Sequence, residues 1–258
     1  MKATLTFLGT GTSGGVPEIG CDCEVCRSTD PKNNRLRTSA WLHNKDISVL
    51  FDCSSDFRQQ ALKFGIKHLD AVFVTHTHHD HISGVDDLRS FCNYNEKIKV
   101  YIRQSEAENF RRTYHYMFEP LTQIGGGIPN IDLLEIYNNE RFMIKNVIFE
   151  PLEVFHGILP ILGYKFGNVV YITDAKSLPE STIEKASKIK YLIINTLRYK
   201  AHETHLNIEE MLEVVKKIKP HQTFLIHTTH QMDYEKVAGE LPDKIRMAYD
   251  GMELEIEV

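Results

Sequence analysis

The stretch Thr75-His-Thr-His-His-Asp-His81 brings four groups that can bind metal ions, His76, His78, Asp80 and His81, into six positions. The apolar run just before it predicts a buried β-strand that ends at the cluster. Residues i and i+2 of an extended chain point to the same side, so His76 and His78 can bind one ion. Asp80 and His81 fall where the chain must turn and can reach a second ion. Two ions about 3.5–4 Å apart would form a hydrolytic site.

Length and composition allow one large domain with its own core. The chain has 258 residues, 42% of them hydrophobic, and a net charge of −5. Nucleic-acid-binding proteins usually carry a basic face, so this charge argues against nucleic acid as the main partner. No apolar run approaches the roughly 20 residues of a membrane span, and Met1–Leu8 is too short and too strand-like for a signal peptide. We therefore expect one cytoplasmic domain over residues 1–258, with no membrane association.

Strand-like apolar runs alternate with helix-like segments along the chain. The expected strands are Thr4–Leu8, Ser39–His43, Ile47–Asp52, Ala71–Thr75, Lys99–Ile102, Val147–Val154, Leu162–Lys165, Val169–Thr173, Tyr191–Asn195, Gln222–Ile226 and Glu253–Val258. The expected helices are Phe57–Phe64, Val85–Phe91, Glu106–Thr113, Ser181–Ser187, Ile208–Lys217 and Tyr234–Glu240. Asn207, with Glu210 three residues later, predicts a capping box at one helix start. This mixed order favours an α/β (α+β) fold of two packed sheets flanked by helices.

Two segments have no apolar period. Gly9–Thr38 contains glycines, proline and clustered cysteines, and Tyr114–Asn130 contains aromatic residues followed by three consecutive glycines. Long loops without secondary structure are usually functional in compact domains. A metal ion could hold the first. The inserted loop 114–130 is a candidate flap over the site or, alternatively, a plain surface loop.

The run Gly9-Thr-Gly-Thr-Ser-Gly14 has the GxGxxG form of a dinucleotide-binding turn. That fingerprint also needs a helix to open at once, whereas Val16-Pro17 and the cysteines follow here. We therefore expect these glycines to let the backbone approach a metal ion or an anion instead.

The remaining metal ligands should come from other strand ends, because one loop cannot surround two ions. His156, Asp174 and His227 each follow an expected strand, and His230 lies three residues beyond His227. An acidic or imidazole group directly after an apolar strand is solvated or functional rather than part of the core. In this order along the chain, these residues complete the set that begins at His76.

This pattern resembles the metallo-β-lactamase superfamily, whose signature is HxHxDH followed by a distant His, Asp and His. The resemblance extends over essentially the full length and implies a four-layer αββα sandwich with a dinuclear site along one edge of its sheets. It implies two ion sites, one bound by His76, His78 and His156 and the other by Asp80, His81 and His227, with Asp174 bridging them.

Two further features narrow the resemblance to one branch. Leu5–Thr12 is similar to the opening strand and glycine turn of the tRNase Z-like and cyclic phosphodiesterase members. Gly20-Cys-Asp-Cys-Glu-Val-Cys-Arg27 looks like the extra zinc site of the PhnP-like phosphoribosyl cyclic phosphodiesterases. In that site a histidine three residues after the last active-site ligand completes the set, as in His227-Thr-Thr-His230. The resemblance thus implies a structural zinc that pins loop 9–38, bound by Cys21, Cys23, Cys26 and His230.

Three more residues receive roles from their positions. His205, in Ala-His-Glu-Thr-His-Leu, is similar to the catalytic histidine of the same branch and could give a proton to the leaving oxygen. A surface histidine is the alternative there. Asp52 ends a strand near the metal loop and could accept the second N–H of a ligating histidine. Asp250 resembles part of the C-terminal turn of the family and is expected to be structural.

These resemblances therefore imply a metal-dependent hydrolase of a small cyclic phosphodiester, such as phosphoribosyl 1,2-cyclic phosphate. Zinc or manganese fits the two active-site positions, where Asp80 and Asp174 would orient the nucleophile. Three alternatives stay open: a tRNase Z-like nuclease, a thioester or lactone hydrolase, and a non-catalytic accessory protein of cofactor biosynthesis. The inserted loop carries no net basic charge, which argues against tRNA processing. A homodimer is possible, since homo-oligomers are common.

Overall fold

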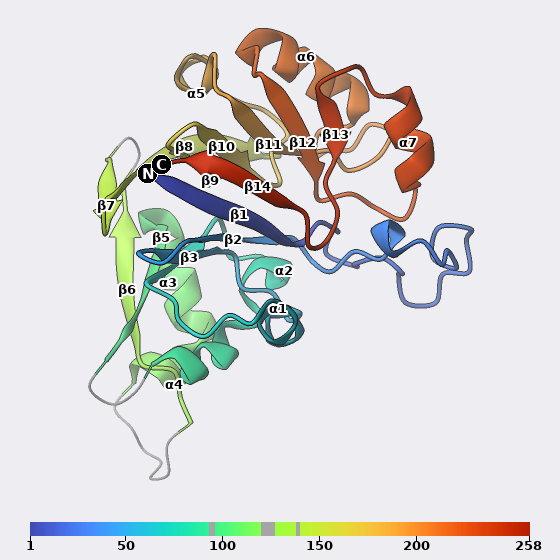
Figure 1. The fold of residues 1–258 in the computed structure, drawn as a ribbon. Helices are drawn as coiled ribbons and strands as arrows, with labels where there is room; N and C mark the ends of the chain where they lie inside the picture. The colour runs from blue at the N-terminus through green and yellow to red at the C-terminus, as the bar shows by residue number, and fades with distance from the viewer. Residues whose placement is uncertain (93–95, 120–126, 138–139) are drawn as a thin grey trace.

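A computed structural model describes residues 1–92, 96–119, 127–137 and 140–258, and these form two seven-stranded sheets packed face to face (Figure 1). The first sheet contains, in spatial order, β14 (Glu253–Glu257), β1 (Lys2–Gly9), β2 (Ser39–His43), β3 (Ser48–Phe51), β4 (Ala71–Val74), β5 (Ile98–Arg103) and β6 (Ile131–Ile136). The second contains β13 (Ile245–Met247), β12 (Gln222–Ile226), β11 (Tyr191–Asn195), β10 (Val169–Ile172), β9 (Leu159–Phe166), β8 (Val147–His156) and β7 (Phe142–Ile144).

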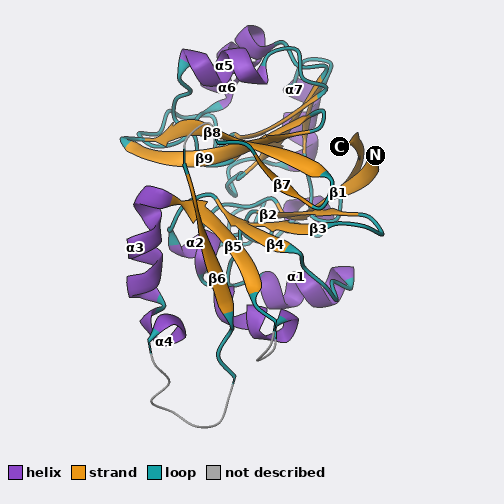
Figure 2. Cartoon of the chain, turned by 90° about the vertical axis from the view of Figure 1, so that its left-hand side faces the viewer, coloured by secondary structure: helices purple, strands orange, loops and turns teal. Residues whose placement is uncertain are grey.

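Helices cover the two outer faces, as Figure 2 shows from the side. Against the first sheet lie α1 (Phe57–Phe64), α2 (His79–Ile82), the 3₁₀ helix η2 (Val85–Phe91), α3 (Gln104–Thr113) and α4 (His115–Phe118). Against the second lie α5 (Glu180–Ala186), α6 (Ile208–Ile218) and α7 (Tyr234–Glu240). The chain thus has the metallo-β-lactamase fold, and the predicted sandwich of two sheets between two helical layers is confirmed.

Three apolar clusters hold these four layers together. The cluster between the sheets is rich in aromatic rings, among them Phe51, Phe73, Phe149 and Tyr164, all with no exposed surface. Phe73 meets Phe149 edge to face with ring centroids 4.7 Å apart, a favoured geometry for aromatic pairs. Separate clusters join each sheet to its own helices. Because the sheets are buried on both faces, the ends of their strands are rigidly placed.

Most predicted elements are present, with small shifts at their ends. The capping box at α6 is confirmed, because Asn207 accepts from the Glu210 backbone and the Glu210 side chain accepts from Asn207 in return. Three strands were not predicted, namely β6, β7 and β13. Each lies at an edge of a sheet, and two of the three have only three residues, so neither length nor burial gives them a strong apolar pattern.

The N-terminal loop 9–38 contains one short 3₁₀ helix, η1 (Pro31–Asn33), and no helix opens after Gly14 in this described part of the chain. The expected approach of the glycines to a metal ion or an anion stays a prediction, and the glycines have close backbone neighbours of their own. A Cβ on Gly9 would lie 2.0 Å from the Arg37 carbonyl oxygen, and one on Gly11 would lie 2.8 Å from that of Arg35. The glycines therefore make room for the returning strand of the same loop. Gly11 N–H donates to the Leu36 carbonyl there, at 2.8 Å.

The second irregular segment, loop 114–130, includes α4 in its first residues, which was not predicted. The expected flap is loop 114–130, and its residues 120–126 lie outside the described residues, so the flap stays a prediction. Among the helices of the described chain, none is both long and apolar enough to cross a bilayer.

Candidate metal centre

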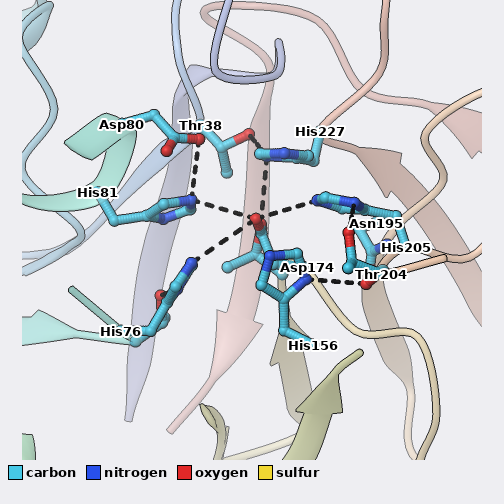
Figure 3. A network of polar contacts seen from close by, with 12 residues as sticks. Thr38, His76, Asp80, His81, His156, Asp174, Asn195, Thr204, His205 and His227 are labelled. Carbon is cyan, nitrogen blue, oxygen red and sulfur yellow. Dashed lines mark hydrogen bonds and ion pairs between the residues drawn. The ribbon is translucent and has the colours of Figure 1, made fainter. Parts of the chain in front are cut away.

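The candidate ligands lie where strands of both sheets end. His76 and His78 follow β4, and Asp80 and His81 lie in the short helix α2 that the chain forms immediately afterwards. His156 is the last residue of β8, Asp174 comes two residues after β10, and His227 directly follows β12. Figure 3 labels all of these side chains except His78 and shows them converging from the two sheets on a common centre.

The converging side chains form two groups. In each group, one ligand atom per residue lies within 4.8 Å of all the others. The groups are His76, His78 and His156, and Asp80, His81, Asp174 and His227. The structure thus brings together every residue that the sequence nominated for the active-site ions. All are buried except His78, which is exposed.

Asp174 stands at the centre of both groups. Its Oδ2 lies 3.8 Å from His76 Nε2 and 3.4 Å from His81 Nε2, and its Oδ1 lies 3.2 Å from His227 Nδ1 (Figure 3). Burial alone would raise the pKa of Asp174, but the surrounding histidines outweigh it and hold this pKa well below its usual value. The residue is therefore a carboxylate that can contact an ion on either side.

The hydrogen bonding of two ring nitrogens that point into the centre indicates whether a cation fits there. His76 Nε2 and His81 Nε2 are buried and have no hydrogen-bond partner among the described residues. Leaving such atoms unpaired is costly unless something else engages them. Burial also lowers the pKa of His76, and it lowers that of His227 to about 4, so both rings are neutral and offer a lone pair. Neutral imidazoles beside carboxylates suit a divalent metal.

A second layer of contacts orients the candidate ligands. Asp52 Oδ2 lies 2.7 Å from His81 Nδ1, so Nε2 of that ring is the atom turned towards the centre. The Thr204 carbonyl oxygen lies 2.8 Å from His156 Nδ1 in the same way. The sequence indicated Asp52, because it follows a strand. It could not indicate Thr204, because the contact is made by the backbone carbonyl, which every residue type has.

Three of these residues adopt left-handed backbone conformations directly after strands. Asp52, Asp174 and His227 have φ of 58°, 58° and 56°. Residues other than glycine rarely adopt this region, and such residues cluster at functional sites. The unusual turn lets each side chain leave the strand end towards the centre.

His205 lies on the loop between β11 and α6, beside the same centre, and is partly buried. Its Nε2 is 3.2 Å from Asp174 Oδ2, and its ring stacks on that of His227 at 5.1 Å between centroids. His156, Asp174 and His205 form a further group, in which one ligand atom of each residue lies within 4.8 Å of the others. The residue is therefore placed to touch whatever binds at Asp174.

A separate cluster lies on loop 9–38. Cys21 Sγ and Cys23 Sγ are 3.2 and 3.3 Å from His230 Nδ1, and Cys26 completes a group of four within 4.8 Å. A hydrogen bond from the Cys26 backbone, with help from His230, lowers the pKa of Cys23 to about 6. A thiolate is the form that binds metal. Three cysteines and one histidine in this arrangement fit a tetrahedral zinc site.

Comparison with known proteins assigns the family. A model of the β-lactamase superfamily domain matches residues 48–228, which include the candidate ligands from His76 to His227. The chain belongs to the β-lactamase superfamily. Within this superfamily it is similar to a diphosphatase of the PhnP family, with 35% identity, a TM-score of 0.92, and 99% of this chain and 98% of that one covered. That similarity spans both clusters and places the chain in the PhnP family.

Two other relatives carry different names. The chain is 41% identical, over 97% of its length, to an octanoyltransferase of Porphyromonas gingivalis. It spans about half (51%) of the length of that protein. It is also 30% identical to a ribonuclease Z of Natronomonas pharaonis, over 43% of this chain and 32% of the other. The chain is thus similar to parts of relatives whose names describe different activities.

Proposed function

We propose that this protein is a dinuclear metal-dependent phosphodiesterase. The observation that carries the proposal is the central Asp174 carboxylate, which lies between a group of three histidines and a second group of mixed His and Asp residues. A carboxylate can bridge two cations, and paired cations suit displacement at phosphorus. Similarity to the PhnP-family diphosphatase supports a phosphorus-containing substrate.

In this proposal the first ion is held by His76, His78 and His156, and the second by Asp80, His81, Asp174 and His227. When bound, the ions would supply Lewis acidity, which lowers the pKa of water and offsets charge on the phosphoryl oxygens. Zinc and manganese both fit a set of imidazoles and carboxylates. The cluster of Cys21, Cys23, Cys26 and His230 would hold a third ion, a structural zinc.

The residues of the chain would then orient the reaction. Asp80 and Asp174 hold the attacking water, whose oxygen forms the new bond to phosphorus. The bond to the leaving alkoxide breaks with its electron pair, and that oxygen takes a proton from His205 Nε2. The proton lost by the attacking water replaces the one that His205 gave. The product is a phosphate monoester.

A small cyclic phosphodiester, such as phosphoribosyl 1,2-cyclic phosphate, is the substrate that we favour. The thiol cluster beside the centre is the feature that the PhnP-like phosphodiesterases share with this chain. The net charge of −5 gives no support for a nucleic-acid partner. We accordingly propose a small-molecule substrate rather than RNA.

Hydrolysis of bis(p-nitrophenyl) phosphate tests the proposal. Protein reconstituted with zinc or manganese should release nitrophenolate, and protein stripped of metal by a chelator should not. Phosphoribosyl 1,2-cyclic phosphate is then assayed for release of a monoester. If the reconstituted protein holds its metals and turns over neither ester, the phosphodiesterase proposal fails.

Similarity to the octanoyltransferase favours a second candidate, hydrolysis of an acyl thioester at the same centre. The same ions could polarise a thioester carbonyl as well as a phosphoryl group. Octanoyl thioester and bis(p-nitrophenyl) phosphate assayed side by side separate the two candidates. Turnover of the thioester alone would favour the second. Metal content without turnover of either would favour a non-catalytic role.

A further inference from the structure

A second histidine stands behind His205, on the side away from the centre. His202 Nδ1 lies 3.3 Å from His205 Nδ1, and the two rings meet at 64° with centroids 5.1 Å apart. The opposite nitrogen of His205, Nε2, faces Asp174 Oδ2 at 3.2 Å. Two imidazole nitrogens at hydrogen-bond distance need one proton between them, because two lone pairs would repel.

The surrounding contacts decide which ring carries that proton. The backbone N–H of Thr204, which can only donate, points at His202 Nδ1 at 3.3 Å. His202 Nδ1 is therefore an acceptor, and the proton between the rings belongs to His205 Nδ1. The Thr204 hydroxyl oxygen lies 2.9 Å from His205 Nδ1 and 3.2 Å from His202 Nδ1. It can accept from the same Nδ1–H of His205, which then shares its proton between this oxygen and His202 Nδ1.

We propose that His202 is a positioning residue that holds His205 as its Nδ1–H tautomer. Nε2 is then the one nitrogen of His205 that exchanges a proton at the centre. The inference rests on the proposed phosphodiesterase function and narrows its substrate class to phosphodiesters with an unactivated alkoxide leaving group. In a hydrolytic triad the buried aspartate fixes the tautomer of its histidine through the same ring nitrogen.

The chemistry gives the reason for this substrate class. When the P–O bond breaks, an alkoxide leaves with the electron pair and needs a proton, whereas a nitrophenolate or a thiolate leaves without one. His205 gives the proton from Nε2 and must then remain neutral with its proton on Nδ1. The lone pair of His202 stabilises that neutral form and keeps the ring in place. Positioning of His205 by His202 gives no advantage when the leaving group needs no proton.

Three variants test the proposal on two substrates. His202→Ala removes the acceptor, His202→Asn can place an amide oxygen near the position of Nδ1, and His221→Ala is the control, because His221 is exposed. His202→Ala should lower kcat on a ribose cyclic phosphate by about 10- to 100-fold, the usual loss for a residue that orients a reacting one. Its kcat on bis(p-nitrophenyl) phosphate should change by less than about 3-fold, because nitrophenolate needs no proton. His202→Asn should restore most of the loss, and His221→Ala should match wild type.

Long-range ¹H–¹⁵N spectra of histidine-labelled protein, with and without zinc, give a readout besides activity. The His205 ring, assigned by its absence in His205→Ala, should carry its proton on Nδ1 in wild type and His202→Asn and lose that preference in His202→Ala. Equal kinetic losses on both substrates, or an Nδ1 without a proton in wild type, would overturn the inference. If wild type hydrolyses neither ester, the proposed function fails, and the spectra alone decide the tautomer.

Discussion

The two candidate metal clusters of this protein are positioned in opposite ways. The ligands of the central cluster leave the ends of strands buried between helices and sheets, and His76, His81, Asp174 and His227 are at most 2% exposed. In the thiol cluster the three cysteines lie on loop 9–38 and His230 lies beyond β12, and all four residues are partly exposed. Strand ends are placed by the core, whereas the loop residues are placed chiefly by one another and by a few polar contacts.

Arg35 makes some of the polar contacts that hold that loop. Its guanidinium is buried and donates to the carbonyl oxygens of Thr229 and Met232, at 3.0 and 2.5 Å, on the segment that carries His230. Burial lowers the pKa of Arg35 to about 10, so the residue stays charged at neutral pH. We therefore expect the central cluster to bind metal after the protein has folded. At the thiol cluster, metal binding should itself contribute to the folding of the loop. Four predictions test this difference.

Asp174→Asn should have the largest effect, and it should be confined to the central cluster. The substitution keeps the shape of the side chain and removes the charge that both ligand groups face. We expect kcat/KM for the phosphodiester to fall by about 10³-fold and active-site metal to be lost, whereas the melting temperature changes little. Steady-state kinetics and metal analysis measure this. Retained turnover, or loss of all metal including that of the thiol cluster, would contradict the separation of the two sites.

Cys23→Ser should have the converse outcome. One zinc per chain should be lost, and stability should fall by about 2–4 kcal/mol, taking closure of a long loop by a covalent cross-link as the guide. Limited proteolysis should cut within residues 10–38 in the variant and spare them in wild type. Cys92→Ser is the matched control, since Cys92 lies outside the cluster. Unchanged zinc content and melting temperature would remove the case for a structural zinc.

Asp52→Asn should lower the metal affinity of the central cluster without abolishing metal binding. Asp52 accepts from the Thr75 backbone N–H at 2.8 Å and faces His81 Nδ1 at 2.7 Å, and asparagine tolerates its left-handed conformation. Loss of the charge behind His81 should lower active-site metal affinity about 10- to 100-fold. Titration of metal-free protein with zinc measures this. An unchanged affinity would mean that the core alone orients His81.

The same difference between the clusters explains what the sequence could predict. The bounds of β2, β11, β12, α1 and α7 are as expected, because each is an apolar or periodic run between turns. The central ligands were found because His and Asp after apolar runs are conspicuous. The structure gathers them, and their roles as ligands remain proposals.

Apart from the contact of Asp52 with His81, the contacts that orient these residues were not predicted. Thr38 Oγ1 lies 3.2 Å from His227 Nδ1 across 189 positions of the chain, and Thr204 contributes a backbone carbonyl to His156. Neither contact has a local pattern, because the partners meet only once the sheets have packed. The role of Arg35 was missed for the same reason, since a single buried cation resembles any surface arginine in sequence.

Asp250 joins the two regions, and its titration should give the smallest effect. Its carboxylate accepts from Thr10 Oγ1 at 2.8 Å and from the Leu36 backbone N–H at 2.7 Å, both on or beside the loop. The Thr10 carbonyl in turn accepts from the backbone N–H of Thr228, next to His227. Burial outweighs these hydrogen bonds and raises the pKa of Asp250 to about 7.

The sign of the pH dependence follows from that shift. In the unfolded chain an aspartate loses its proton near pH 3.9, whereas folded Asp250 keeps it to about pH 7. Its contribution to stability is therefore full below the unfolded pKa and is lost as pH rises through the folded one. Because the side chain keeps some contact with solvent, we expect Asp250→Asn to change the difference in unfolding free energy from wild type by about 1–2 kcal/mol between pH 5 and pH 8. Urea unfolding at both pH values measures the change. If the difference in unfolding free energy is the same at both pH values, Asp250 is charged at both. Water would then reach its carboxylate between loop 9–38 and the core.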